Sequence, residues 1–120
     1  MSKILVVDDE PDIGELLQTF LESYGYHVIV ASTSARAFEL VHLEKPDLVF
    51  LDVIMPGMDG IQCLKEIRKI HPEGIVIMLS GLHDENVAKE AIRWGAYDYL
   101  TKPLDLQFLR NDLLPRIFPS

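Results

Sequence analysis

A run of four consecutive apolar residues, Leu48 to Leu51, places the strongest limit on the fold of this chain. A half-exposed strand alternates apolar and polar side chains, whereas a strand covered on both faces reads as a continuous apolar run. The run therefore predicts a central strand of a parallel sheet with helices above and below it. Because Asp52 follows at once, its carboxylate is expected at the carboxyl end of that strand, where open α/β sheets bind their ligands.

Short apolar runs of this kind alternate with helical patterns along the whole chain. Strands are expected at residues 3–7, 26–31, 48–51, 75–79 and 97–100, with five amphipathic helices among them and after the last. Such alternation, with right-handed crossovers, builds a mostly parallel sheet. We therefore predict a single α/β domain over residues 1–120, a doubly wound five-stranded parallel sheet with helices on both faces and the flavodoxin-like strand order 2-1-3-4-5.

The helical patterns contain some irregular positions. The first stripe consists of Ile13, Leu16, Leu17, Phe20 and Leu21. Gly14 is a weak point inside this helix, and Gly25 is expected to end it in a left-handed conformation. Pro115 should interrupt the last helix. The helix that Asp84 can cap has small inner residues, which predicts weak anchorage and mobility; these residues are Val87, Ala88, Ala91 and Ile92.

Composition excludes several classes of protein. The chain has 120 residues, of which 48% are hydrophobic and 25% charged, as in one globular domain. Its formal net charge of -8 argues against direct nucleic-acid binding by this domain. The longest apolar run near the N-terminus, Ile4 to Val7, is too short for a signal peptide or a membrane span, so a cytoplasmic protein is expected. The single cysteine, Cys63, is expected to be a buried structural thiol.

Polar residues follow four of the five expected strands. Asp8 and Asp9 end the first, Asp52 the third, Ser80 the fourth, and Lys102 comes after the fifth. Taken alone, Asp52 reads as the start of a turn. Parallel strands bring all these residues to one edge, however, and converging carboxylates repel one another unless a cation neutralises them. Oxygen ligands suit Mg²⁺, so the sequence predicts a magnesium site here.

Ser80 and Lys102 add groups that a metal site does not need. A hydroxyl and a cation facing a carboxylate can hold the oxygens of a phosphoryl group, with Asp52 as the nucleophile that forms an acyl phosphate. A cis Lys102-Pro103 bond is one way to aim the lysine, although its isomer stays open at this stage. A solvated lysine and a turn serine remain the alternatives for these two positions.

The pattern resembles the receiver domains of two-component response regulators, and the resemblance covers essentially the whole chain. Its motifs are Val6-Val7-Asp8-Asp9-Glu10, Leu51-Asp52 with Met55-Pro56-Gly57-Met58-Asp59-Gly60, Ser80-Gly81, and Gly95-Ala96-Tyr97-Asp98-Tyr99-Leu100-Thr101-Lys102-Pro103. The resemblance implies that Asp52 is the phosphoacceptor. It also implies that Mg²⁺ is bound by Asp9, Asp52 and the backbone carbonyl of Ile54, with Asp8 acting through water.

Further roles come from the same resemblance. Ser80 and Tyr99 match the switch pair, in which the hydroxyl turns toward the phosphoryl group and the ring packs into the vacated space. Gly81 matches the small residue beside the site. Ile54 and Leu82 match the positions that flank the approach of water to the phosphorus. Because both are apolar and branched, they predict a long-lived phosphoryl group.

The resemblance also implies partners. The phosphoryl group would come from a sensor histidine kinase or a phosphotransfer protein, and the conformational change would control an output domain or partner, with transcription as one output. Such a receiver is a signalling protein with self-phosphorylation and self-dephosphorylation chemistry only, not an enzyme. The chain reads either as a free-standing receiver or as the front piece of a longer regulator. A homodimer formed on phosphorylation stays open, because Pro115 puts a dimer through the last helix in doubt.

Two other classes remain as alternatives. A magnesium-dependent aspartyl-phosphate phosphatase uses similar groups, but its nucleophile follows the first strand in a D-x-D arrangement, which differs from Asp8-Asp9-Glu10. A dinucleotide-binding module needs a glycine-rich turn after that strand, and none is present. The histidines, which are His27, His42, His71 and His83, show no metal-ligand spacing and are mostly expected at the surface or in loops. His83 alone is expected near the site, and an ordinary loop position is favoured for it.

Overall fold

A parallel sheet of five strands forms the centre of the computed structural model, which describes residues 2–55, 57–81 and 83–119. The strands are β1 (Lys3–Val7), β2 (His27–Ala31), β3 (Leu48–Asp52), β6 (Ile75–Ser80) and β7 (Asp98–Thr101). Their order is β2-β1-β3-β6-β7, and each neighbouring pair is parallel. Numbered within this sheet, the order is 2-1-3-4-5. The predicted fold class and strand order are therefore confirmed.

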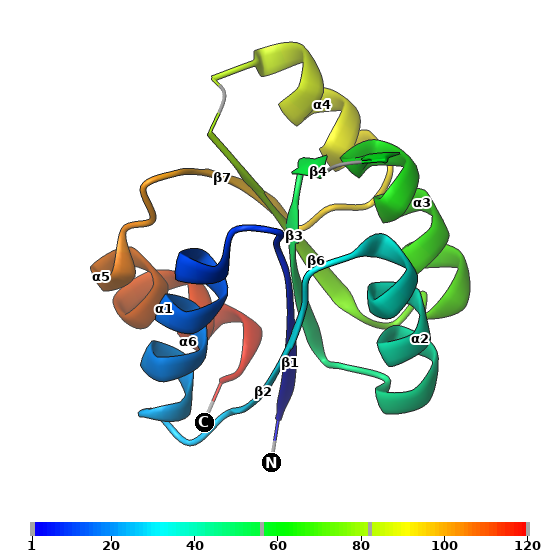
Figure 1. Ribbon diagram of the computed structural model, residues 1–120. Helices are drawn as coiled ribbons and strands as arrows, with labels where there is room; N and C mark the ends of the chain where they lie inside the picture. Colours follow the sequence, from blue (N-terminus) through cyan, green and yellow to red (C-terminus); the bar gives the residue numbers. More distant parts are fainter. Residues whose placement is uncertain (1, 56, 82, 120) are drawn as a thin grey trace.

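Helices cover both faces of the sheet (Figure 1). The helices are α1 (Pro11–Glu22), α2 (Ser34–Glu44), α3 (Gly60–Ile70), α4 (Glu85–Arg93), and a C-terminal helix of three segments, α5 (Leu106–Phe108), the π-helical η1 (Leu109–Leu113) and α6 (Leu114–Ile117). In Figure 1, α1 and the C-terminal helix lie on one side of the sheet, and α2, α3 and α4 lie on the other.

The apolar core is divided in two by the sheet because side chains along a strand alternate between its faces. In β3, Leu48 and Phe50 pack with residues of α1 and the C-terminal helix, whereas Val49 and Leu51 pack with residues of α2 and α3. All four residues are fully buried. The continuous apolar run therefore forms a strand covered on both faces, as predicted.

A short antiparallel hairpin follows β3 and was not predicted. It pairs β4 (Ile54–Met55) with β5 (Met58–Asp59), and Asp59 then caps α3 by accepting a hydrogen bond from the Ile61 amide. Gly60 lies where a Cβ atom would come within 2.3 Å of the Val53 carbonyl oxygen. The hairpin and this close approach turn the chain sharply from the end of β3 into α3, next to Asp52.

Several expectations about individual positions need correction. Leu16 is 42% exposed rather than part of the buried stripe of α1. Gly14 is buried, and a Cβ atom there would lie 2.9 Å from Val30 Cγ1, so its small size allows α1 to approach β2 closely. Gly25 has the expected positive φ, at 89°. The fifth strand runs one residue later than predicted, and the second begins at His27 rather than Tyr26.

The last helix is distorted ahead of Pro115 rather than interrupted there. The Leu114 amide donates to the Leu109 carbonyl, a wide π-type turn, and Pro115 lies in the first turn of α6, which continues to Ile117. A proline ring inside a regular α-helix clashes with the carbonyl four residues earlier, and a wider turn relieves that contact. The predicted interruption was therefore wrong in form, since the helix accommodates the proline by widening.

The expected weak anchorage of α4 agrees with its burial. Within this helix only Ala91 is buried, and Ile92 is 49% exposed. Asp84 caps the helix as predicted, since its side chain accepts hydrogen bonds from the Asn86 and Val87 amides. Among the described residues, no helix is long and apolar enough to cross a membrane.

Candidate functional site

The carboxyl edge of the sheet gathers polar residues from four strands. Asp8 follows β1, Asp52 ends β3, Ser80 ends β6 and Lys102 follows β7. The strand register places these residues at the same height along the sheet. Val7 pairs with Leu51, which precedes Asp52. Ser80 pairs with Thr101, which precedes Lys102. Parallel pairing of β1, β3, β6 and β7 therefore creates the cluster that the strand ends predicted.

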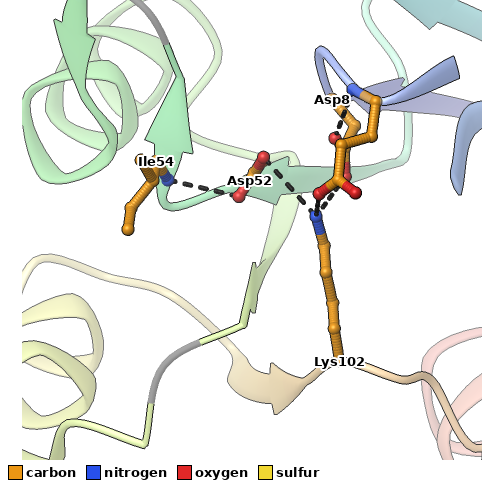
Figure 2. Close-up of polar contacts among 5 residues, drawn as sticks. Asp8, Asp52, Ile54 and Lys102 are labelled. Atoms are coloured by element: carbon orange, nitrogen blue, oxygen red, sulfur yellow. Dashed lines mark hydrogen bonds and ion pairs between the residues drawn. The ribbon is translucent and has the colours of Figure 1, made fainter.

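Lys102 lies at the centre of the cluster (Figure 2). Its Nζ atom is 2.7 Å from Glu10 Oε1, 2.9 Å from Asp8 Oδ2 and 3.5 Å from Asp52 Oδ2. Its side chain is only 12% exposed, and its backbone amide donates to the Ser80 carbonyl at 2.6 Å. The following peptide bond, Lys102-Pro103, is cis, which answers the question left open by the sequence.

The two buried carboxylates are oriented by the turns that follow them. Asp52 is 5% exposed, and its Oδ1 accepts a hydrogen bond from the Ile54 amide at 3.2 Å. Asp8 is 2% exposed, and its Oδ1 accepts from the Glu10 amide at 2.9 Å. The second oxygen of Asp8, Oδ2, is buried and receives no hydrogen bond of normal geometry, although it is in ion-pair contact with Lys102.

The electrostatics of the site follow from this burial. Desolvation raises the pKa of Asp52 from 3.8 to about 6; the hydrogen bond from Ile54 and the charge of Lys102 oppose the rise, and the charge of Asp8 adds to it. For Lys102, burial disfavours the charged form. The hydrogen bond to Glu10, the close contact with Asp8 and the charges of Asp8 and Asp52 outweigh burial and raise the pKa of Lys102. At neutral pH both groups are therefore charged.

A metal ion would find its ligands among the same carboxylates. Oxygens of Asp8, Glu10 and Asp52 lie within 4.8 Å of one another. Hard oxygen donors at this spacing, among them the buried Asp8 Oδ2 that receives no hydrogen bond of normal geometry, fit a divalent ion such as Mg²⁺. Glu10 was not among the predicted ligands, and Asp9, which was, is exposed and does not belong to this group.

Glu10 is thus the site residue that sequence reasoning missed. The signal was its place in the run Asp8-Asp9-Glu10, but strand-end placement alone favoured the first two acids. In the structure, the Glu10 amide donates to Asp8 Oδ1 within this turn, and the Glu10 side chain reaches Lys102.

The residues expected to form the switch and the water approach are arranged around this centre. Ser80 is buried at the end of β6. Tyr99 is half-buried on β7, two residues before the partner of Ser80, so both side chains lie on one face of the sheet. The Ile54 side chain is 58% exposed, and a Cβ atom at Gly81 would meet no atom within 4 Å. Leu82 lies outside the described residues.

The cysteine and the histidines are not among the residues that form ion pairs with Lys102 in the described part of the chain. Cys63 is buried, as expected, and burial raises the pKa of its thiol to about 12. His27, His42 and His83 are exposed. His71 is buried, unlike the others, and its Nε2 lies 2.9 Å from the Pro46 carbonyl oxygen, so it joins the end of α3 to the loop before β3.

Comparison with known proteins agrees with this geometry. The family model of the response regulator receiver domain matches residues 4–114. Transcriptional regulatory protein ZraR of Escherichia coli (strain K12) is 42% identical over 110 residues, which are 92% of this chain and 25% of ZraR. The alkaline phosphatase synthesis transcriptional regulatory protein PhoP of Bacillus subtilis (strain 168) is 45% identical over 101 residues, 84% of this chain and 42% of PhoP.

Solved structures show the same likeness. A two-component response regulator from Clostridium difficile superposes with a TM-score of 0.92 at 29% identity, over 98% of this chain and 95% of that one. The match to ZraR and PhoP, by contrast, covers well under half of each of those proteins. Since the family model spans nearly the whole chain, this chain belongs to the response regulator receiver domain family.

Proposed function

We propose that this receiver domain takes a phosphoryl group onto Asp52 from the phosphohistidine of a sensor histidine kinase or a phosphotransfer protein, in a Mg²⁺-dependent reaction. The observation that carries the proposal is the position of Asp52 at the carboxyl edge of the sheet. Its Oδ1 is held by the Ile54 amide at 3.2 Å, and its Oδ2 faces Lys102 at 3.5 Å. A nucleophilic carboxylate is thereby oriented beside a cation that can receive phosphoryl oxygens.

The proposed chemistry is the transfer of one phosphoryl group from a histidine nitrogen to a carboxylate oxygen. An oxygen of Asp52 attacks the phosphorus, an acyl phosphate bond forms, the bond from phosphorus to the histidine nitrogen breaks, and the imidazole leaves with a proton from solvent. Because the pKa of Asp52 is about 6, its carboxylate is ionised and nucleophilic at neutral pH. Lys102 remains protonated and offsets the negative charge of the incoming group.

Mg²⁺ is the proposed cofactor, with Asp9, Asp52, the Ile54 carbonyl and Asp8 as the proposed ligand set. The clustering of Glu10 with Asp8 and Asp52 supports a divalent ion at this edge and adds Glu10 to the residues that would face it. When bound, the ion would neutralise the carboxylates and the phosphoryl oxygens. The residues of this chain supply the nucleophile, the ammonium group and the orientation.

The conformational response is proposed to run through Ser80 and Tyr99. Once Asp52 carries a phosphoryl group, the Ser80 hydroxyl turns toward it and the Tyr99 ring moves inward. Their placement on one face of the sheet supports this pairing. The hollow next to Tyr99, lined also by Ala88 and Ile92 of α4, gives the ring room to change position.

The biological setting follows from the family. We propose a cytoplasmic signalling role rather than that of a turnover enzyme, with no direct contact to nucleic acid or membrane. Transcription is the proposed output, carried by an output domain or a partner, because ZraR and PhoP are named as transcriptional regulators. A homodimer formed on phosphorylation also stays a proposal. The comparisons give no support to the phosphatase alternative.

The experiment that tests the proposal is phosphorylation by a small donor. Incubation with acetyl phosphate and Mg²⁺ should add one phosphoryl group per chain, read by intact mass, and Asp52→Asn should abolish the addition. Asp12→Asn, which removes an exposed carboxylate from the first turn of α1, is the matched control and should be labelled like the wild type. Full labelling of Asp52→Asn would refute the assignment, and repeated turnover of a phosphate ester would favour a phosphatase.

A further inference from the structure

Glu10 differs from the other two carboxylates that contact Lys102. Its side chain is 60% exposed, whereas those of Asp8 and Asp52 are 0% and 6% exposed. Glu10 nevertheless makes the shortest contact with the lysine, a hydrogen bond of 2.7 Å, against 3.5 Å from the lysine to Asp52. In the unphosphorylated protein the ammonium group is thus nearer to Glu10 than to the proposed phosphoacceptor.

The position of Glu10 at the start of α1 makes this contact unusual. Glu10 is the N-cap of the helix, and its carbonyl accepts hydrogen bonds from the Ile13 and Gly14 amides. The side chain of an N-cap residue commonly accepts a hydrogen bond from a free amide of the first turn, but that of Glu10 makes no such bond. The side chain contacts Lys102 instead.

Building on the phosphoacceptor function proposed above, we propose that Glu10 is a positioning residue that holds Lys102 away from Asp52 until a phosphoryl group arrives. The phosphoryl oxygens on Asp52 then become the stronger partner for the ammonium group, and Glu10 releases it. Because the Glu10 carboxylate is already exposed, water can solvate it after release. Asp8 is buried and has no such alternative, so it keeps its contact with Lys102.

This inference predicts that breaking the Glu10 contact speeds phosphorylation. An ion pair with one exposed partner, here Glu10, contributes little to stability. If phosphorylation no longer has to break this contact, its rate should rise by about two- to five-fold. The rate of labelling by acetyl phosphate at saturating Mg²⁺ should rise by this factor in Glu10→Gln.

Two further variants separate loss of the contact from loss of negative charge. Glu10→Asp keeps the charge but shortens the side chain by one methylene group, and aspartate at an N-cap prefers the helix amides. It should label as fast as Glu10→Gln. Glu15→Gln removes an exposed charge of α1 that lines one surface hollow together with Asp8 and Glu10, and this variant should label at the wild-type rate. If Glu10→Asp matches the wild type while Glu10→Gln is faster, charge repulsion explains the effect and the inference is wrong.

A second measurement tests the contact without phosphorylation. In the absence of Mg²⁺, urea unfolding of Glu10→Gln, Lys102→Gln and the double variant gives the coupling between the two side chains. A coupling of about two- to five-fold in the unfolding equilibrium constant is expected. Additive effects, or labelling rates unchanged in both Glu10 variants, would overturn the inference. Failure of the wild type to label at Asp52 is a different result, because it refutes the phosphoacceptor function itself.

Discussion

Removing the charge of Asp52 should stabilise the fold when no Mg²⁺ is bound. The pKa of this carboxyl rises from 3.8 to about 6 because burial and the charge of Asp8 disfavour its ionised form. At 1.36 kcal/mol per pKa unit, keeping Asp52 ionised costs about 3 kcal/mol of folding free energy near neutral pH. Asn has nearly the same shape, so Asp52→Asn should recover most of this cost.

The gain is expected to be smaller than the full cost. An asparagine oxygen can accept the hydrogen bond from Ile54 that Asp52 Oδ1 accepts now, and its NH₂ group can donate to Asp8. Its NH₂ group cannot accept from Lys102, however, so the ion pair at 3.5 Å is lost. We therefore expect Asp52→Asn to raise the free energy of unfolding by about 1–3 kcal/mol, which is a large effect for a single substitution.

The pH dependence of this gain has a definite sign. Because the pKa of Asp52 is higher in the folded protein than in the unfolded chain, the folded state binds more protons between about pH 4 and pH 6. The cost of ionised Asp52 is therefore absent below this window, grows as pH rises through it, and is complete above it. The advantage of Asp52→Asn should be full at about pH 7.5 and fall to about half at about pH 5.

Urea unfolding with a metal chelator, at both pH values, measures the difference directly. The other carboxylates titrate in both proteins, so subtraction of the two free energies isolates Asp52. Asp9→Asn is the matched control, because Asp9 lies at the same sheet edge but is exposed, and it should change stability little at either pH. If Asp52→Asn is destabilised near neutral pH, or if its gain does not depend on pH, the desolvation argument is wrong.

Three other outcomes are expected. Mg²⁺ should raise the melting temperature, and at a hundredfold excess over its dissociation constant the free energy of unfolding should rise by about 2.7 kcal/mol. The rise in melting temperature should be smaller in Asp9→Asn. An equal rise in both proteins would mean that the ion binds elsewhere. The phosphoryl group should be long-lived, and Ile54→Asn and Leu82→Glu should each accelerate its hydrolysis several-fold, as followed by intact mass. An unchanged rate of hydrolysis would mean that these two side chains do not govern the access of water. Gly14→Ala should lower the free energy of unfolding by about 1 kcal/mol, because the Cβ atom of the new alanine would lie 2.9 Å from Val30 Cγ1. This decrease in stability should disappear when Gly14→Ala is combined with Val30→Ala.

The sheet and the edge that carries the site could be predicted because both follow from short, strongly patterned segments. The apolar run before Asp52 had to be buried on both faces, and parallel pairing then forced the ends of the strands to one edge. No side-chain detail was needed to bring Asp8, Asp52, Ser80 and Lys102 together. Their distances and burial came only from the structure.

What could not be predicted depends on contacts that periodicity does not encode. The stripe of α1 is wider than the surface it covers, so Leu16 fits the pattern yet stays exposed. Pro115 predicts a break, but whether the helix ends or forms a wider turn depends on how its side chains pack. Here Leu109 and Leu113 of the π-helical segment are both fully buried, so the packing of this segment is kept while the helix widens. His71 is buried beside Gly74, where a Cβ atom would lie 2.5 Å from the imidazole ring, and the helical pattern does not show that these two residues meet.

The charges at the sheet edge set stability against the function proposed for Asp52. Three carboxylates, those of Asp8, Glu10 and Asp52, face the single ammonium group of Lys102, which leaves two negative charges uncompensated. Two positive charges are what a divalent cation carries, so the site is matched to such an ion. A sequence selected for stability alone would place a neutral residue at Asp52, but that residue could not attack phosphorus. On the proposed function, the raised pKa of Asp52 is the thermodynamic cost of keeping an ionised nucleophile beside Lys102, whose ammonium group lies nearer to Glu10.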